Sequence, residues 1–493
     1  MAITAGSNLN TVPSPAQNTL ASNFIDFTAQ ATSGWAQQYL PDLMEKEAEV
    51  FGNRTVSGFL SQVGAEEAMT ADQVVWSEQG RLHLAYVGTI DASASKVTIS
   101  GYAGTNASYP TASTGNHGLR PGDTCIVASA TVTYVGRVST VDGTRDNDVV
   151  ILPYTQGHAS EAGIGMGDET VTVLKYGSEW GKGSDTPYTT ANEPTHTSFS
   201  NKPVIIRDMY HVSGSDASAI GWVEVAGEDG TGGYLWYLKA EGETRMRFTD
   251  NLEMTCLEGV RGANDTTIDS TAVASGGYGG SDGDNIGTQG LFDAIKDRGN
   301  ATSGISGVNA ATDLAEFDAI LAEFDKQGAI EENMMFLNRS TSLAIDDMLA
   351  SMNSYGAGGT SYGVFDNSED MALNLGFAGF RRGSYDFYKS DWKYLNDQGT
   401  RGAINDRATA DAIRGVIVPA GVSSVYDQLL GKNLKRPFLH VRYRASQTDD
   451  RRMKTWVTGS VGAATSELDA MRVNYLSERC LITQGANNFM LMQ

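Results

Sequence analysis

The sequence predicts an α+β fold with a small all-β domain inserted into the first half of the chain. Between Val74 and Tyr176, short apolar runs with a period of two are separated by Gly, Asp and Asn clusters, as in a small barrel or sandwich. After Gly259, helical segments alternate with short apolar strands. One long helical pattern, Thr231–Gly259, separates the two halves, and we expect the rest of the chain to be organised around it.

The long helical pattern combines one apolar face with a polar middle. The residues that share the apolar face are Tyr234, Leu238, Phe248 and Leu252. In the middle, Glu241 stands four residues before Arg245, and Glu243 stands four residues before Arg247. This spacing stabilises a helix by about 0.2–0.5 kcal/mol per pair. About 25 residues at a rise of about 1.5 Å make a rod of about 37 Å, which we interpret as a half-exposed scaffold element.

The β-rich segment is expected to be an insertion, because strand patterns lie on both sides of it. Its expected strands are His83–Ile90, Lys96–Tyr102, Thr124–Ala128, Thr131–Val141, Val149–Pro153 and Thr170–Tyr176. Residues 178–200 contain Pro187 and Pro194 and are expected to form a polar linker. The segments Pro203–Val212 and Ala219–Val225 are then expected to return as strands towards the long helix.

The second half begins with the clearest helix of the chain, Asn309–Lys326. Its apolar stripe consists of Leu314, Phe317, Ile320, Leu321 and Phe324. The strand Asn333–Leu337 follows, and then a helix with Ser340 as its N-cap. The buried positions expected in that helix are Leu343, Met348, Leu349 and Met352. The remaining expected elements are a short helix at Ala408–Ile413 and the strands Gly415–Pro419, Pro437–Ala445, Arg452–Ser460, Arg472–Leu476 and Cys480–Gln484.

Composition excludes several classes of protein. The 493 residues include 59 acidic and 36 basic side chains, and the net charge of −23 argues against a general nucleic-acid binder. Three widely separated cysteines fit neither a disulfide framework nor a metal site and indicate a reducing compartment. The sequence contains no signal-peptide pattern and no apolar run of about 18 residues. We therefore expect a soluble intracellular product with no membrane segment.

Motifs for catalysis and metal binding are weak. The run Gly359–Gly363 matches the nucleophile-elbow pattern, but it lacks the strand before it and the helix after it that the chemistry requires. The six histidines include no pair at i,i+3 or i,i+4. The acidic pairs Asp346-Asp347 and Asp449-Asp450 fit solvated helix faces or turns better than acid–base couples. We expect no enzyme, and no catalytic, metal-binding or cofactor-binding residues.

The C-terminal part of the chain carries a charge of opposite sign to the rest. Residues 401–493 contain 13 Lys and Arg against 8 Asp and Glu, a local charge of +5. Three interpretations remain open: basic residues paired within the chain, contact with acidic surface on an adjacent copy, or contact with DNA. The candidate inter-subunit contacts in this region and on the long helix are Arg436, Arg442, Arg444, Arg451, Arg452, Lys454, Glu241, Glu243, Arg245 and Arg247.

The order of elements resembles that of the major capsid proteins of tailed double-stranded DNA bacteriophages, the HK97-like fold. The resemblance rests on Pro203–Val225 leading into the long helix and on Met334–Asn338 leading into a Ser/Thr-capped helix. It also rests on the tail Asn474–Met492. It covers the N-terminal arm and roughly residue 200 to the end, and it consists of element order rather than diagnostic motifs.

The resemblance implies a division of the chain into capsid domains. These are an N-terminal arm (1–60), an extended loop (61–87 and 181–230), an inserted β-barrel or sandwich (88–180), a spine helix of the peripheral domain (231–262), an axial domain (263–431), and peripheral strands that return to the axial domain (432–493). Within the extended loop, Val74–Trp76 and Pro203–Val225 would form the two sides.

The function implied by the resemblance is structural. The chain would self-assemble into hexamers and pentamers of an icosahedral head that encloses double-stranded DNA without sequence-specific binding. It would be part of the virion, assembled in the host bacterial cytoplasm. Expected partners are other copies, scaffolding and portal proteins, and an accessory or head-fibre protein on the inserted domain. The alternatives are a β-rich phage fibre or adhesin and a carbohydrate-active enzyme.

Overall fold

The computed structural model describes most of the chain after residue 57 and divides it into two compact units. The described residues are 58–60, 65–79, 83–103, 117–141, 147–155, 157–183, 196–218, 225–226, 232–233, 236–261, 287–327, 330–354, 379–407, 411–420, 422–427, 432–461 and 464–493. Among these, unit 1 comprises Ile205–Leu252 and Gln447–Glu478. Unit 2 comprises Gly58–Val204, Glu253–Ser446 and Arg479–Gln493. We describe each unit by itself.

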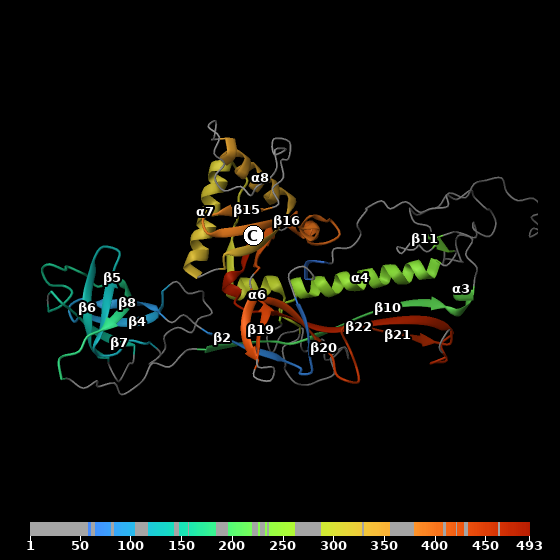
Figure 1. Cartoon of the computed structure of the whole chain (residues 1–493), viewed down its shortest axis with the longest axis horizontal. Helices are drawn as coiled ribbons and strands as arrows, with labels where there is room; N and C mark the ends of the chain where they lie inside the picture. Colours follow the sequence, from blue (N-terminus) through green and yellow to red (C-terminus); the bar gives the residue numbers. More distant parts are fainter. Residues whose placement is uncertain are drawn as a thin grey trace, which may run out of the picture. The chain divides into compact units, whose positions relative to one another are not determined.

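Unit 2 contains a closed antiparallel barrel (Figure 1). Its strands are β3 (Ala85–Asp91), β4 (Lys96–Tyr102), β5 (Asp123–Ala128), β6 (Thr133–Val141), β7 (Asp148–Pro153) and β8 (Thr170–Ser178). They follow the order β3-β4-β7-β6-β5-β8 around the barrel. Every second residue points inward, and Val97, Val138 and Ile151 are fully buried there. All six strands expected in this segment are confirmed, with ends shifted by at most two residues.

A mixed six-stranded sheet forms a second part of unit 2. In order across the sheet, its strands are β13 (Asn300–Thr302), β23 (Met490–Met492), β17 (Gly415–Pro419), β14 (Glu332–Leu337), β16 (Tyr385–Asp391) and β15 (Gly379–Arg382). Two helices, α7 (Ala310–Gln327) and α8 (Arg339–Ser354), share one hydrophobic core with this sheet (Figure 1). Phe336 is also buried, and its ring lies 4.6 Å from that of Phe59.

Shorter elements complete unit 2. The helices are α6 (Leu291–Arg298), α9 (Lys393–Asn396), α10 (Arg401–Asn405) and the 3-10 turn η2 (Ala486–Asn488). Strand β1 (Ala65–Met69) pairs in parallel with β20 (Leu439–Arg444). Two antiparallel pairs join β18 (Val422–Asp427) to β19 (Lys432–Pro437), and β2 (Val74–Gln79) to β9 (His196–Asn201).

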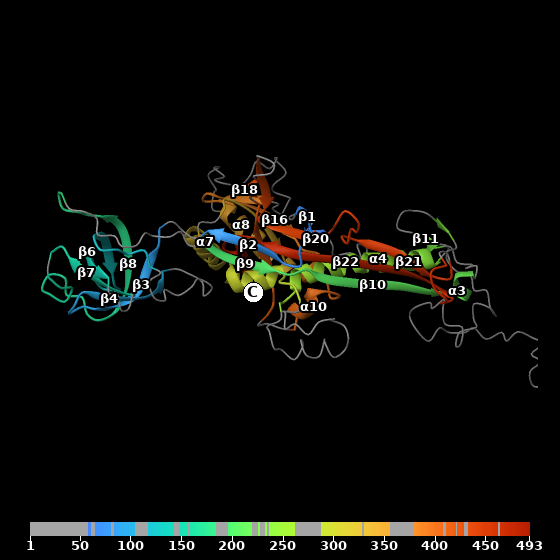
Figure 2. The same ribbon diagram turned by 90° about the horizontal axis from the view of Figure 1, so that it is seen from below.

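Unit 1 is a small sheet covered by one long helix. The helix is α4 (Trp236–Glu258), and the strands are β10 (Val204–Ser213), β21 (Lys454–Gly459) and β22 (Ala470–Thr483). Figure 2 shows the three strands as long ribbons running side by side. The smaller elements α3 (Gly214–Ser218), β11 (Val225–Ala226) and β12 (Gly232–Gly233) complete the unit. The division into units falls within α4 and within β22.

The core of unit 1 explains the apolar face of the long helix. Phe248 and Leu252 of α4 pack with Val473 and Tyr475 of β22, and Ile206 of β10 packs against them. The two other residues expected on this face, Tyr234 and Leu238, have side chains outside the described part. The helix begins at Trp236, later than expected, because Gly232–Gly233 pairs as a strand with Val225–Ala226.

Helix α7 follows the expected stripe, whereas α8 corrects two predictions. In α7, Phe317, Ile320 and Phe324 are buried, and the other two stripe residues pack against them. In α8 the N-cap is Asn338 rather than Ser340, because the Asn338 Oδ1 accepts the Thr341 backbone N–H at 2.9 Å. Leu343 is exposed, and Ile345 occupies the buried face with Met348 and Leu349.

Three further predictions differ from the structure. A helix lies at Arg401–Asn405 rather than at Ala408–Ile413, of which 411–413 are not helical and 408–410 fall outside the described residues. The strands expected at Arg472–Leu476 and Cys480–Gln484 are one strand, β22. Ser477, which lies between the two expected strands, is buried, and its Oγ donates to the Arg452 carbonyl at 2.6 Å.

The third difference concerns the strand partner of Val74–Trp76. The structure pairs it with His196–Asn201, within the segment expected to be a linker. The strand expected at Pro203–Val212 is confirmed as β10 (Val204–Ser213), and it lies next to β22. The sequence also predicts a helical segment at residues 24–60, and these residues lie almost entirely outside the described part.

Candidate assembly site

Strands β2 and β9 form a two-stranded ribbon, and we call its buried part, around Trp76, Phe199 and Asn201, the root of the ribbon. At this root the guanidinium of Arg298 lies over two neighbouring aromatic rings, 5.5 Å from the Trp76 centroid and 4.5 Å from the Phe199 centroid, and the two ring centroids are 6.3 Å apart. The Arg298 side chain is 5% exposed, and its Nη1 lies 3.7 Å from Glu78 Oε1. Burial lowers the pKa of Arg298, and the Glu78 carboxylate opposes that shift. A planar cation that contacts one ring from each strand stabilises the pairing of the two strands.

A buried amide fixes the end of β9. The Asn201 side chain is 1% exposed, and its Nδ2 donates to the carbonyls of Leu481 at 2.6 Å and Gln289 at 3.0 Å. Its Oδ1 accepts the Gln289 N–H at 2.9 Å and the Thr288 hydroxyl at 3.2 Å. Because both ends of the amide are satisfied, the side chain is stable in a buried place and holds one orientation.

The ribbon has one covered face and one open face. Val74 and Trp76 pack with Met69, Cys480 and Ile482 in a small core. Val75 points the other way and is 62% exposed. A two-stranded sheet is only marginally stable by itself, so the free face of this ribbon is a candidate surface for a partner.

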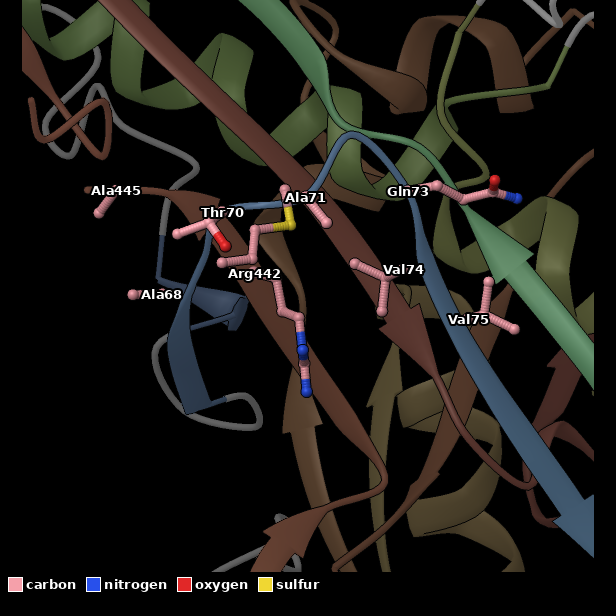
Figure 3. Close-up of a pocket in the computed structure, with 9 residues that line it drawn as sticks. Ala68, Thr70, Ala71, Gln73, Val74, Val75, Arg442 and Ala445 are labelled. Carbon is pink, nitrogen blue, oxygen red and sulfur yellow. The ribbon is translucent and has the colours of Figure 1, made fainter.

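An open hollow lies beside the start of the ribbon (Figure 3). Its volume is about 440 Å³, and it is lined by residues of β1, the following turn, β2 and β20. Figure 3 shows Thr70 and Ala71 after β1, Val74 and Val75 on β2, and Arg442 on β20. The lining combines apolar side chains with the polar side chains of Thr70, Gln73 and Arg442.

A buried carboxylate anchors the first described residues. Glu253 of α4 accepts the backbone N–H groups of Gly58, Phe59 and Leu60 at 2.7, 2.6 and 3.2 Å. The Phe59 ring also stacks on Trp392, with centroids 4.6 Å apart. A carboxylate that accepts several unpaired N–H groups at the start of a helical turn is strongly stabilised. The end of the expected N-terminal arm is therefore fixed to unit 2.

Most of the basic candidates on the C-terminal strands have partners within the chain. Arg442 pairs with Glu67 at 2.9 Å, Arg451 with Glu478 at 2.8 Å, and Lys454 with Asp449 at 2.7 Å; Arg444 pairs with Asp72. These contacts favour the first of the three interpretations, pairing within the chain. Ion pairs at the surface contribute about 0–1 kcal/mol each, whereas the Glu478 carboxylate that pairs with Arg451 is buried.

The remaining candidates are placed as follows. Arg452 is exposed, and its backbone N–H donates to Asp450 Oδ1 at 2.9 Å. Arg436 belongs to β19, and its side chain lies outside the described part.

The long-helix candidates differ in exposure. Glu241 accepts the Tyr475 hydroxyl at 3.4 Å, and Glu243 is half-buried. Arg245 and Arg247 are exposed. An inter-subunit role for any of these residues stays a prediction.

The sequence reasoning missed the residues that hold this site together. Arg298, Asn201 and Glu253 are single polar residues without a motif around them, and their partners are distant in the sequence. The only available signal was an isolated charge among apolar residues, such as Glu253 in the apolar end of the long helix.

Reactive groups are scarce in the described part of the chain. Within it, no three His, Cys, Asp or Glu residues are grouped as metal ligands, and no helix is both long and apolar enough to cross a membrane. Burial raises the pKa of each of the three cysteine thiols to about 12. Asp346 forms a buried ion pair with Lys389. The Gly359–Gly363 motif lies outside the described residues.

Comparison with known proteins gives remote structural similarities only. No family model and no curated protein sequence matches the chain. A solved structure from Mycobacterium phage Ogopogo is 8% identical, with 93% of this chain and 97% of that chain covered and a TM-score of 0.40. The capsid of the native GTA particle is 11% identical, with 95% and 98% covered and a TM-score of 0.33.

A third similar structure is the capsid of the Cyanophage P-SCSP1u. It is 8% identical, with 64% of this chain and 80% of that chain covered and a TM-score of 0.32. Structures of phage capsids are thus among those that this chain resembles. At such identities and TM-scores the similarity by itself carries no conclusion about function.

Proposed function

We propose that this chain is the major capsid protein of a tailed bacteriophage and self-assembles into the shell that encloses the genome. The single observation that carries the proposal is the β2–β9 ribbon. Its root is built from buried Arg298 and Asn201, while Val75 on its other face is exposed. A ribbon that is rigid at its root and bare on one face is suited to lie across a neighbouring copy.

Two further features support assembly rather than catalysis. Helix α4 is long and packs one face on the sheet of unit 1, which makes it a stiff strut. The net charge of −23 suits a container that must not bind its DNA tightly. Under this proposal, hexamers and pentamers gain stability by summing many modest contacts over a closed lattice.

The domain assignments of the sequence analysis become part of this proposal. The six-stranded sheet with α7 and α8 would be the axial domain, and unit 1 the peripheral domain. The barrel would be the inserted domain, and the β2–β9 ribbon would belong to the extended loop. Scaffolding, portal and accessory proteins would be the further partners, and the virion the location.

Electron microscopy of the purified full chain tests the proposal directly. We expect closed shells or, at low concentration, rings of five or six copies. Elongated trimers would instead indicate a fibre protein, and discrete globules at all concentrations would indicate a monomeric protein such as an enzyme. Either of these outcomes contradicts the proposal.

A variant at the ribbon root links assembly to the observation that carries the proposal. Arg298→Ala removes the cation that lies over Trp76 and Phe199. We expect the free energy of unfolding of this region to fall by about 2 kcal/mol. This is less than for a fully buried ion pair, because Glu78 is partly exposed. Hydrogen exchange should accelerate in β2 and β9, and fewer shells should form. The matched control is Lys296→Ala on the same helix, an exposed residue that should change neither readout. If a folded Arg298→Ala chain assembled normally, the ribbon would not be required for assembly.

A further inference from the structure

Among the described barrel residues, the exposed large apolar side chains are concentrated on some strands and not on others. Five of them are between 38% and 56% exposed: Val135, Leu152, Tyr154, Leu174 and Tyr176. All five belong to β6, to β8 or to β7 and the residue after it. On the β3–β4 wall, the exposed outward residues include Thr89, Thr98 and Ser100, which are polar.

Strand register shows that these side chains form one continuous patch. Ile126 of β5 is directly opposite Leu174 of β8 on one side and Val135 of β6 on the other. The Tyr154 N–H donates to the Val135 carbonyl at 3.2 Å, which extends this row to the fourth strand. Directly opposed residues have Cβ atoms about 4.5–5.5 Å apart, so neighbouring side chains along this row contact one another.

A second row beside the first supplies the polar edge. Leu152 is opposite Arg137. The Arg137 guanidinium lies over the Trp180 ring at 5.9 Å, and its Nε donates to the Glu179 carbonyl at 3.2 Å. The Tyr154 hydroxyl donates to Glu179 Oε2 at 2.5 Å. We name the surface formed by Ile126, Val135, Arg137, Leu152, Tyr154, Leu174, Tyr176, Glu179 and Trp180 the barrel patch.

We propose that the barrel patch binds the barrel patch of a second copy of this chain, an inference that rests on the proposed function of self-assembly. The charge balance favours this occupant. The chain carries a net charge of −23, so two copies approach most readily through a surface with few charges. The patch holds one cation and one anion around an apolar centre.

The shape of the barrel points the same way. Its six strands close in a ring, so pairing through a free strand edge is not open to them, and contact must be made by side chains. A two-fold contact requires a self-complementary surface, in which Arg137 of one copy meets Glu179 of the other. Contiguous exposed apolar area with aromatic residues and an arginine at its rim is the usual composition of such an interface.

Cysteine crosslinking in the purified full chain tests the inference. Val135→Cys places a thiol at the centre of the patch, and Thr89→Cys places one on the polar wall. The native cysteines are all buried and stay silent. With a short bis-maleimide reagent, we expect Val135→Cys to form crosslinked dimers about tenfold faster than Thr89→Cys, because docking raises the effective thiol concentration.

A charge variant provides the second arm. Leu174→Glu in the Val135→Cys chain should abolish most of the crosslinked dimer, because it places like charges face to face, whereas Thr89→Glu in the same chain should leave the yield unchanged. Equal crosslinking at both cysteine positions, or a yield insensitive to Leu174→Glu, overturns the inference.

The outcomes separate this inference from the proposed function. Shells in the wild-type chain without Val135→Cys crosslinks would reject the barrel contact and leave the capsid function standing. Specific crosslinked dimers in a chain that never forms shells would support the barrel contact and reject the capsid function.

Discussion

The barrel and the helix-covered sheet of unit 1 are built from similar alternating strands but bury their apolar residues differently. In the barrel, closure of six strands places Val138 and Ile151 in a shared interior, and each strand is paired on both sides. In unit 1, the strands need a helix from elsewhere in the sequence to cover one face. Tyr475 of β22 contacts Glu241 of α4, a residue 234 positions away.

This difference concerns where each region obtains its stability. The barrel strands lie within about one hundred residues of one another in the sequence, whereas the unit 1 core joins α4 to β22, which is distant from it in the sequence. The sheet also keeps exposed apolar residues on β10, namely Ile205 and Met209. We therefore expect a core substitution to affect mainly the region that contains it.

The largest expected effect comes from Phe248→Ala in unit 1. Phe248 is fully buried with its ring 5.7 Å from that of Tyr475, and its loss should lower the free energy of unfolding by about 3–5 kcal/mol. Hydrogen exchange should show lost protection in α4, β10 and β22, with the barrel strands unchanged. Arg245→Ala, an exposed change on the same helix, is the control. Equal loss of protection in the barrel strands would contradict the prediction that the effect is confined to unit 1.

A smaller effect is expected from Ile151→Val in the barrel. Removing one buried methyl group should lower the free energy of unfolding by about 1 kcal/mol, and hydrogen exchange should localise the change to the barrel. Leu152→Val, at the next and outward-facing position, should be nearly neutral for folding. If both substitutions cost the same, the inward and outward faces of β7 would be wrongly assigned.

The smallest effect concerns the pH dependence of unit 1. Burial, reinforced by Glu241, raises the pKa of Tyr475 to about 12 from its usual value of about 10. Because the folded state holds this proton more tightly, Tyr475 contributes stability that is present below pH 10 and is lost as pH rises to about 12. Tyr475→Phe should flatten the decline of the melting temperature between these values and change stability at neutral pH by less than about 1 kcal/mol. An unaltered slope would contradict the prediction.

The same comparison separates what was predictable from what was not. The barrel strands and α7 follow from short-range periodicity, because each residue's neighbours along the chain determine which face it occupies. Errors arose where a polar residue is satisfied by a distant partner. Ser477 and Glu478 lie in the gap expected between two strands, yet both are buried within β22 and bond to Arg452 and Arg451.

The candidate site was the least predictable part. Arg298 stabilises the ribbon because folding places it over Trp76 and Phe199, which belong to two strands far apart in the sequence. Glu253 lies in a helix whose pattern gave no reason to expect a partner near residue 58. The basic residues chosen from sequence were noticed for their charge, which periodicity cannot pair with particular acids.

Sequence alone predicted the alternating strands, the amphipathic helices, the acidic balance and an order of elements that resembles capsid proteins. These properties depend on local steric and hydrophobic preferences, which act between neighbours in the chain. Tertiary contacts were needed to establish that β2 pairs with β9, that β22 is one strand and that outward apolar residues of neighbouring barrel strands lie next to one another. Register and closure arise from contacts between distant segments, and the free energy of those contacts depends on three-dimensional packing that no local pattern encodes.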